Sequence, residues 1–495
     1  MRRILLAVLA AGLIVLAVAA VAAYWLLARD GFRRSLEAQA TSWLGQPVRI
    51  GAARAQFFPR PAIQLEAIRV GDPVQLALDD VELAADFRPL LGGRIENADV
   101  RVSDSRIEMP LPFSLPRGPS ATAEATAAGA AAVRIVSIRS IALRDVRLRS
   151  RGREVTVSAD SSLEGTTLAL RRFDAESGRT ALSVEGVVSL SPRIDARLQA
   201  AATRLDLDEL IALADAFTPP ASAAAAPRGS APRIVAAISA AQATAGALSV
   251  AAFTTDLTLD GDSIAFNPLR FEMFGGRYEG SVTARLGSPL SATIESRIAD
   301  LDVAQLAAFG GTADTITGRL SGDGRFTGSG SALPELWQSA RGSGSAEIVD
   351  GSIRRLQLVR TVVLFFGRPA PDAAESSDRF NRLDVTFSLD SRRLRAQKFS
   401  LQSDDADMLG IGSLNLANDA LDGRVDVVLS EALSAQAGTD LYRYTREGNR
   451  VVLPAVIGGT LPMPRLTIDA AAAVQRGIRN EVERRLKGLF EELGR

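Results

Sequence analysis

The stretch LDVTFSLD, residues 383–390, alternates apolar and polar residues over its whole length. In an extended chain, successive side chains point to opposite faces, so this pattern predicts a strand with one apolar and one polar face. The apolar members are Leu383, Val385, Phe387 and Leu389. Related alternation recurs at residues 253–260 and 424–430. These segments predict a body built from half-buried β-strands.

Glycine-containing turn sequences separate the predicted strands. Gly152, Gly261 and Gly275 lie in such sequences, and the pair Asp350-Gly351 has the same composition. Helical patterns long enough to cover a sheet are scarce in the middle of the chain, which disfavours a doubly wound α/β fold. We therefore expect a mainly β protein: an N-terminal transmembrane helix, an elongated and curled antiparallel sheet that forms a repeating β-groove, and a C-terminal amphipathic helix.

An internal repeat supports this architecture. Residues 163–213, shifted by 96 positions, align without a gap on residues 259–309, and apolar positions largely match apolar positions. A further partial copy begins at Leu389. One interpretation of the match is chance, because any β protein rich in leucine and alanine matches itself to some extent. The other is a repeated supersecondary unit that stacks on its neighbours.

Two stretches rich in proline, alanine, serine and glycine interrupt the strand pattern and predict linkers or loops. The predicted organisation is an anchor at 1–28, an N-terminal β region with a leading helix at 29–115, a linker at 116–132, a groove repeat at 133–217, a linker at 218–232, further groove repeats and a C-terminal region at 233–469, and an amphipathic helix at 470–495.

Composition removes several classes of function. The 495 residues include 57 Lys+Arg and 57 Asp+Glu, so the formal net charge is zero, which disfavours nucleic acid as a partner. There is no cysteine and no histidine, so thiolate and imidazole chemistry is excluded. The acidic groups at 79–80 and 404–407 are expected to be solvated loop residues. We expect no catalytic residue, no metal site, no cofactor and no enzyme activity.

The N-terminus predicts a membrane anchor. Residues 4–28 carry no charge, and a helix of that length covers about 37 Å, more than a hydrocarbon core of about 30 Å. A cleaved signal peptide is the competing interpretation, although its apolar region is usually shorter. Arginines lie on both sides of the segment, so charge leaves the orientation open.

Amphipathic helices are predicted at two places. Apolar residues between Phe32 and Leu44 fall mainly at helical spacing, and the helix is expected to end at Gly45. It either lies on its own domain or contacts the membrane surface. At the C-terminus, Asp469 is a candidate N-cap for a helix of about 24 residues. Its apolar side either closes the end of the last sheet or docks to an outer-membrane partner or to lipid.

A sheet with one apolar face must have that face covered, because each large apolar side chain left in water forgoes about 1.5 to 3 kcal/mol of burial free energy. A second sheet would make a dry sandwich. A curled sheet would instead leave an open apolar channel, which the acyl chains of lipids can fill. The candidate groove residues are Leu163, Leu198, Leu257, Leu259, Ile294, Ile298, Leu383, Val385, Phe387, Leu389, Val425, Val427 and Leu429.

Two regions resemble the AsmA family. The first is residues 44–73, where Gly45, Pro47, Val48, Phe58, Pro59 and Pro61 match the family's Gly-x-Pro-Val motif and its Phe-x-Pro-x-Pro step. The second is residues 342–358, whose matching residues are Gly342, Gly344, Asp350, Gly351, Ile353, Leu356 and Leu358.

The resemblance implies a single-pass bacterial inner-membrane protein with its N-terminus in the cytoplasm and its bulk in the periplasm. It further implies a bridge-like lipid transfer protein, which carries phospholipid towards the outer membrane along a repeating β-groove. A scaffold that affects outer-membrane protein insertion through its C-terminal helix, with an outer-membrane or periplasmic protein as partner, is the alternative. An enzyme with Asp404, Asp405 and Asp407 as its best site comes third.

Overall fold

The structure is a computed structural model. It describes residues 33–34, 37–38, 40–41, 44–56, 60–86, 94–109, 134–135, 138–217, 231–353, 361–362, 378–435 and 445–493. The predicted anchor at 4–28 and nearly all of both predicted linkers lie outside these residues. Within the described part of the chain, no helix has the length and apolar character needed to cross a membrane.

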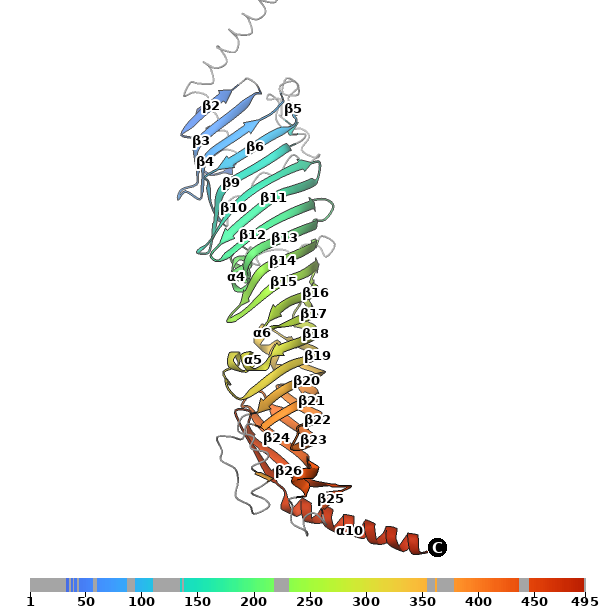
Figure 1. The fold of residues 1–495 in the computed structure, drawn as a ribbon. Coiled ribbons are helices and arrows are strands. Elements are labelled where there is room, and N and C mark those ends of the chain that lie inside the picture. Colours follow the sequence, from blue (N-terminus) through green and yellow to red (C-terminus); the bar gives the residue numbers. More distant parts are fainter. Residues whose placement is uncertain are drawn as a thin grey trace, which may run out of the picture. The chain divides into compact units, whose positions relative to one another are not determined.

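The protein is mainly β, as predicted, and divides into two compact units (Figure 1). The first unit comprises residues 1–253 and 257–261, and the second comprises 254–256 and 262–495.

The first unit contains a mixed sheet and a separate pair of short parallel strands, β5 and β8. Most neighbours are antiparallel, but β6 and β7 each pair with β9 in parallel, and so do β13 and β14. Antiparallel pairing therefore predominates, as predicted, and these parallel pairs correct the expectation of an antiparallel sheet locally. They form where the chain crosses over between two strands, as it does between β13 and β14, so that both strands run in the same direction. Its elements are β1 (Val48–Arg49), β2 (Ala52–Gln56), β3 (Ala62–Val70), β4 (Leu76–Ala84), β5 (Arg94–Ile95), β6 (Ala98–Ser103), β7 (Arg106–Met109), β8 (Arg134–Ile135), β9 (Ile138–Ser150), β10 (Arg153–Glu164), β11 (Thr167–Ser177), β12 (Thr180–Ser189), β13 (Asp195–Asp206), α4 (Leu207–Phe217), β14 (Arg233–Ala245) and β15 (Leu248–Asp260).

In the second unit, neighbouring strands from β16 to β24 run antiparallel, and β26 pairs with both β24 and β27. Its elements are β16 (Ser263–Met273), β17 (Gly276–Arg285), β18 (Leu290–Asp302), α5 (Val303–Phe309), β19 (Ile316–Gly330), α6 (Leu333–Gln338), β20 (Arg341–Ile353), β21 (Asp378–Asp390), β22 (Arg393–Gln402), β23 (Ala406–Asn415), β24 (Ala420–Leu429), α8 (Glu431–Ser434), β25 (Arg446–Glu447), β26 (Arg450–Thr460), β27 (Met463–Ile468) and α10 (Ala470–Leu493).

The repeat is confirmed at the level of the elements. Strands β11 and β12 have the same lengths as β16 and β17, and their bounds are displaced by 96 residues. Strands β22, β23 and β24 begin 130 residues after β16, β17 and β18. The first two strands of each copy are interrupted by a bulge at the same position, between residues 170 and 173, 266 and 269, and 396 and 399.

A helix follows the third strand of every copy, and the residue directly before each helix is a short polar residue that caps its first turn. Asp206 accepts a hydrogen bond from the amide of Glu209 at 3.2 Å, and Asp302 caps α5 through the amide of Ala304 at 2.9 Å. Ser430 caps α8 through the amide of Leu433 at 3.3 Å. A short polar side chain at this position satisfies an amide that the helix leaves unbonded.

The pair Asp350-Gly351 does not form a turn. It lies inside β20, where Val349 pairs with Arg382 and Gly351 pairs with Phe380. Asp350 adopts a φ of 51°. A Cβ on Gly351 would lie 2.1 Å from Cζ of Phe380. The residue pair therefore forms an irregularity within the strand, and the ring of Phe380 packs on the backbone of Gly351 there.

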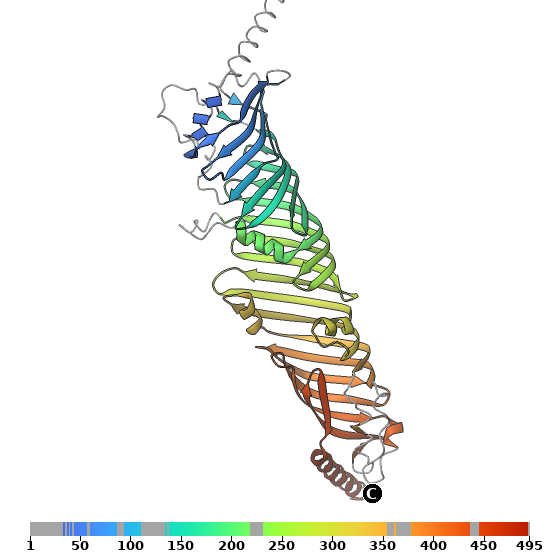
Figure 2. The ribbon, with the colours of Figure 1, turned by 90° about the vertical axis from the view of Figure 1, so that its left-hand side faces the viewer.

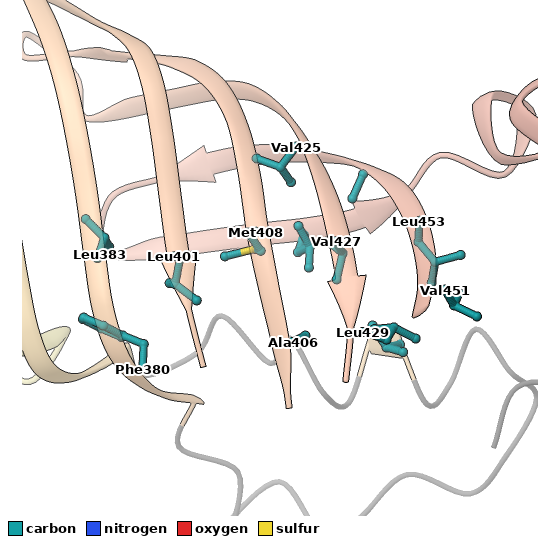
Figure 3. Packing of buried hydrophobic residues seen from close by; sticks show 13 residues of the cluster. Phe380, Leu383, Leu401, Ala406, Met408, Val425, Val427, Leu429, Val451 and Leu453 are labelled. Carbon is teal, nitrogen blue, oxygen red and sulfur yellow. The ribbon is translucent and has the colours of Figure 1, made fainter. Parts of the chain in front are cut away.

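A closed core occupies the C-terminal part of the second unit (Figure 3). Met408, Val427, Leu429, Val451 and Leu453 are all 0% exposed. They come from β23, β24 and β26, and they are joined by Leu401 from β22 and Leu466 from β27. In this region, which we call the closed core, protein side chains fill the apolar side of the sheet.

The helical residues before β1 lie on their own domain, as predicted. Ala40 and Leu44 pack against Val48, Ile50, Ile68 and Val70. Glu37 accepts a hydrogen bond from the amide of Ile50 at 2.8 Å.

Helix α10 begins as predicted, since Asp469 accepts a hydrogen bond from the amide of Ala472 at 3.0 Å. Arg476 makes two hydrogen bonds of 2.8 Å to Asp426 on β24, which raise the pKa of Arg476. The apolar residues Val474, Ile478 and Val482 are 63%, 62% and 50% exposed. These three side chains therefore do not close the end of the last sheet, which was one of the two predicted roles of the helix. The opposite side of the helix, which carries Arg476, contacts the sheet instead.

Candidate functional site

The second unit has an apolar face that no second sheet covers among the described residues. We call it the uncovered face: the side of β16–β20 that carries Val282, Ile294, Ile298, Leu320 and Phe326. Strand pairing aligns these positions, since Ile294 lies opposite both Val282 and Phe326. Their side chains are half-buried, except for Ile294, which is 38% exposed. Figures 1 and 2 show β16–β20 as a single layer of strands.

Two short helices bound this face at opposite ends of β19 (Figure 2). Helix α6 lies over the end of β19, because a Cβ on Gly328 would meet the carbonyl oxygen of Leu336 at 2.5 Å. Helix α5 follows Leu301, which is 1% exposed and pairs with Leu320 near the other end. From Leu320 to Phe326 the strand covers about 20 Å, which is room for several hydrocarbon chains at contact distances of about 4 Å.

Small residues form a row across the face. Gly280, Ser296, Gly324 and Gly344 lie opposite one another on four consecutive strands. A depression of about 750 Å³ lies on the other, polar side of these strands, because its charged lining residues Glu279, Glu295, Arg297, Asp323 and Arg325 alternate with the row. Among these residues Arg325 lies 3.0 Å from Glu295, and Asp323 accepts a hydrogen bond from Ser345 at 2.6 Å.

Aromatic rings lie beside the row. Phe326 and Phe387 stack with ring centroids 6.4 Å apart, and Phe271 stacks on Tyr278 at 4.4 Å. Burial raises the pKa of the Tyr278 phenol, so this group is neutral. The row and the rings of Phe271, Tyr278 and Phe326 were missed at the sequence level, whereas Phe387 was predicted as a groove residue. The available signal was glycine at alternate positions in GDGRFTGSG, residues 322–330, which marks a strand where something packs closely on the backbone.

The predicted groove residues fall into two groups. The half-buried or exposed group consists of Leu163, Leu198, Leu257, Leu259, Ile294, Ile298, Val385 and Phe387. The buried group consists of Leu383, Leu389, Val425, Val427 and Leu429, at most 7% exposed. All of the buried group except Leu389 belong to the closed core, where other side chains cover them. The structure brings Ile294, Ile298, Val385 and Phe387 onto one continuous apolar side, since β20 pairs with both β19 and β21.

The acidic groups singled out in the sequence have protein partners. Asp407 lies 2.9 Å from Arg450, and Asp404 accepts a hydrogen bond from Asn381 at 3.0 Å. Asp79 pairs with Arg69 at 2.8 Å. Within the described ranges, no group of three or more acidic residues is placed to hold a metal ion.

The most strongly shifted carboxyl group lies elsewhere, in the first unit. Hydrogen bonds from Arg139, Ser140 and Arg60 hold the pKa of Asp99 well below its usual range. Arg139 and Ser140 lie on β9 and Asp99 lies on β6, so these bonds tie two parallel strands together, and Arg60 precedes β3.

Comparison of the chain with family models, with curated proteins and with solved structures finds no match.

Proposed function

We propose that this chain is a periplasmic, inner-membrane-anchored protein that binds phospholipid on the apolar faces of its sheets and conducts it for outer-membrane biogenesis. In this proposal residues 4–28 anchor the chain with its N-terminus in the cytoplasm, and the repeated strands form an elongated, curled β-groove. The resemblance of residues 44–73 and 342–358 to the AsmA family supports the assignment. No covalent chemistry is required.

The observation that carries the proposal is the uncovered face. Large apolar side chains that stay half-exposed forgo part of the free energy of burial, about 25 cal/mol per Å². Soluble proteins seldom leave such surfaces contiguous unless something binds there. Between α5 and α6 the exposed surface is apolar and is lined by glycine and aromatic residues, which suits hydrocarbon chains. In the closed core, by contrast, protein side chains cover the apolar side of the sheet.

A photoreactive amino acid tests this in cells. We expect phospholipid adducts when it replaces Phe387 or Leu259, because both side chains are half-buried on apolar sides of their strands. Adducts are measured by mass spectrometry of the purified protein.

Two positions serve as controls. Asp384 lies on the opposite side of the same strand as Phe387, and Val427 is 0% exposed in the closed core. Both should capture no lipid. Equal labelling at Phe387, Asp384 and Val427 would contradict a lipid-binding face.

The exposed apolar side of α10 favours a second candidate, a non-enzymatic scaffold for outer-membrane protein insertion. Val474, Ile478 and Val482 recur every four residues and remain in solvent, while Arg476 holds the helix to Asp426. An anchored helix with a free apolar stripe is suited to hold a partner protein.

Replacing Val474, Ile478 and Val482 together by serine discriminates between the candidates. A scaffold should lose its effect, seen as reduced outer-membrane β-barrel proteins, while lipid capture at Phe387 continues. A lipid conduit should keep both the normal amount of outer-membrane β-barrel proteins and the lipid capture at Phe387. Gln475→Ser, on the exposed part of the same helix, is the matched control.

A further inference from the structure

The depression on the polar side of β17–β20 is a ligand site that the proposed lipid binding does not use. Strand pairing sets its charged residues side by side, since Arg297 lies opposite Glu279 on one neighbouring strand and opposite Asp323 on the other. Arg325 likewise lies opposite Glu295. The volume of about 750 Å³ falls within the range of roughly 300 to 1,000 Å³ that is usual for small-molecule sites.

Arg297 provides free hydrogen-bond donors at the centre of the depression. It forms no ion pair with any residue that the structure describes, because its two neighbours are bonded elsewhere. Glu279 lies 2.8 Å from Arg270, and Asp323 accepts from Ser345 at 2.6 Å. A carboxylate has about four acceptor positions, so both acids also keep free acceptors. Free donors and free acceptors therefore lie next to each other.

The charges around the depression balance. Three carboxylates and the guanidinium groups of Arg297 and Arg325 line it, and Arg270 adds a third positive charge beside Glu279. A ligand with a net charge would gain little attraction from such a mixed site. Nucleic acid requires an excess of positive charge, which is missing here. The electrostatics therefore favour an uncharged ligand.

The position in the sheet excludes two further classes of ligand. The backbone groups of β17–β20 are bonded to neighbouring strands, so an extended peptide finds no free sheet edge there. Among the described residues, no group of three or more acids is placed to hold a metal ion. The remaining lining is rich in hydroxyl and amide side chains: Ser281, Ser343, Ser345, Thr386, Asn267 and Gln397. These groups both donate and accept, as sugar hydroxyls do.

We propose that the depression binds an uncharged oligosaccharide. A sugar hydroxyl accepts from the Arg297 guanidinium and donates to the Glu279 or Asp323 carboxylate, which lie on either side of it. From β17 to β20 the site covers three strand spacings, about 14 Å, which is longer than one sugar ring. The site faces away from the apolar side of the same strands, so this inference does not depend on lipid binding.

Isothermal titration calorimetry of the full chain, purified in a detergent without a sugar headgroup, tests the ligand class. The probes are two uncharged trisaccharides, maltotriose and chitotriose, and the anionic trisaccharide trigalacturonate. We expect at least one uncharged probe to bind more tightly than trigalacturonate. Its dissociation constant should change less than about twofold between about 50 mM and about 500 mM NaCl, because salt screens charge and not neutral hydroxyls.

Arg297→Met should weaken this binding about tenfold, because the substitution removes the central donors. Arg395→Met is the matched control and should leave the affinity unchanged. Arg395 is exposed on the same side of the sheet, since it lies opposite Ser388, which lies opposite Ser343 of the depression. It is not one of the residues that line the depression.

Three results would overturn the inference: binding of neither uncharged trisaccharide, tighter binding of trigalacturonate, or equal losses in the two variants. None of them involves lipid. Lipid capture at Phe387 therefore tests the proposed function separately, and the failure of either idea leaves the other in place.

Discussion

Leu453→Ala is expected to lower the free energy of unfolding of the second unit by about 4 kcal/mol, whereas Leu269→Ala should lower it by about 1 kcal/mol. Leu453 is 0% exposed in the closed core, and its truncation leaves a cavity that close-packed neighbours cannot fill. Leu269 pairs with Gly280 on the small-residue row and is already half-exposed, so its truncation loses less burial.

Native-state hydrogen exchange of the strand amides measures these opening free energies without assuming that the whole chain unfolds in one step. The two substitutions remove the same atoms, so each controls for the other. A loss at Leu269 as large as that at Leu453 would mean that protein covers both sites equally. The lipid-binding proposal would then lose its physical basis.

Gly410→Ala should destabilise the second unit by about 3 kcal/mol. The added Cβ would lie 2.1 Å from the carbonyl oxygen of Arg424 on β24 and 2.8 Å from the Cγ1 of Val425. Since Gly410 pairs with Val425 in the ladder, β23 and β24 would have to separate next to the closed core. The expected result is a lower thermal midpoint and faster exchange of the β23 amides.

Gly458→Ala is the matched control. Gly458 also lies in a strand, β26, and no atom lies within 4 Å of its added Cβ. Because alanine restricts the unfolded chain more than glycine does, this substitution should be neutral or slightly stabilising. Equal thermal midpoints for the two variants would show that the close approach at Gly410 does not constrain the sheet.

Sequence patterns predicted the secondary-structure elements correctly where a single short-range effect, such as strand alternation or N-capping, determines the structure. Alternation in residues 383–390 lies within β21, and the 96-residue shift predicted matching bounds for β11 and β16. Asp469 caps α10 because an N-cap depends on a few neighbouring residues. The pair Asp350-Gly351 was mispredicted because its composition suits a turn, whereas Phe380 from another strand determines its conformation.

Sequence alone determined that the chain is mainly β, that its strands have one apolar face, that a three-strand unit recurs, and that amphipathic helices stand near both ends of the β region. These features follow from side-chain periodicity and capping, which act over a few residues. Only the tertiary structure decided which apolar positions are covered. Val385 and Val427 look alike in their strands, yet Val385 is half-buried and Val427 is 0% exposed, because residues of β26 and β27 pack with Val427 in the closed core, to which Val385 does not belong. Burial depends on what comes to lie above a residue, and strand alternation carries no information about that.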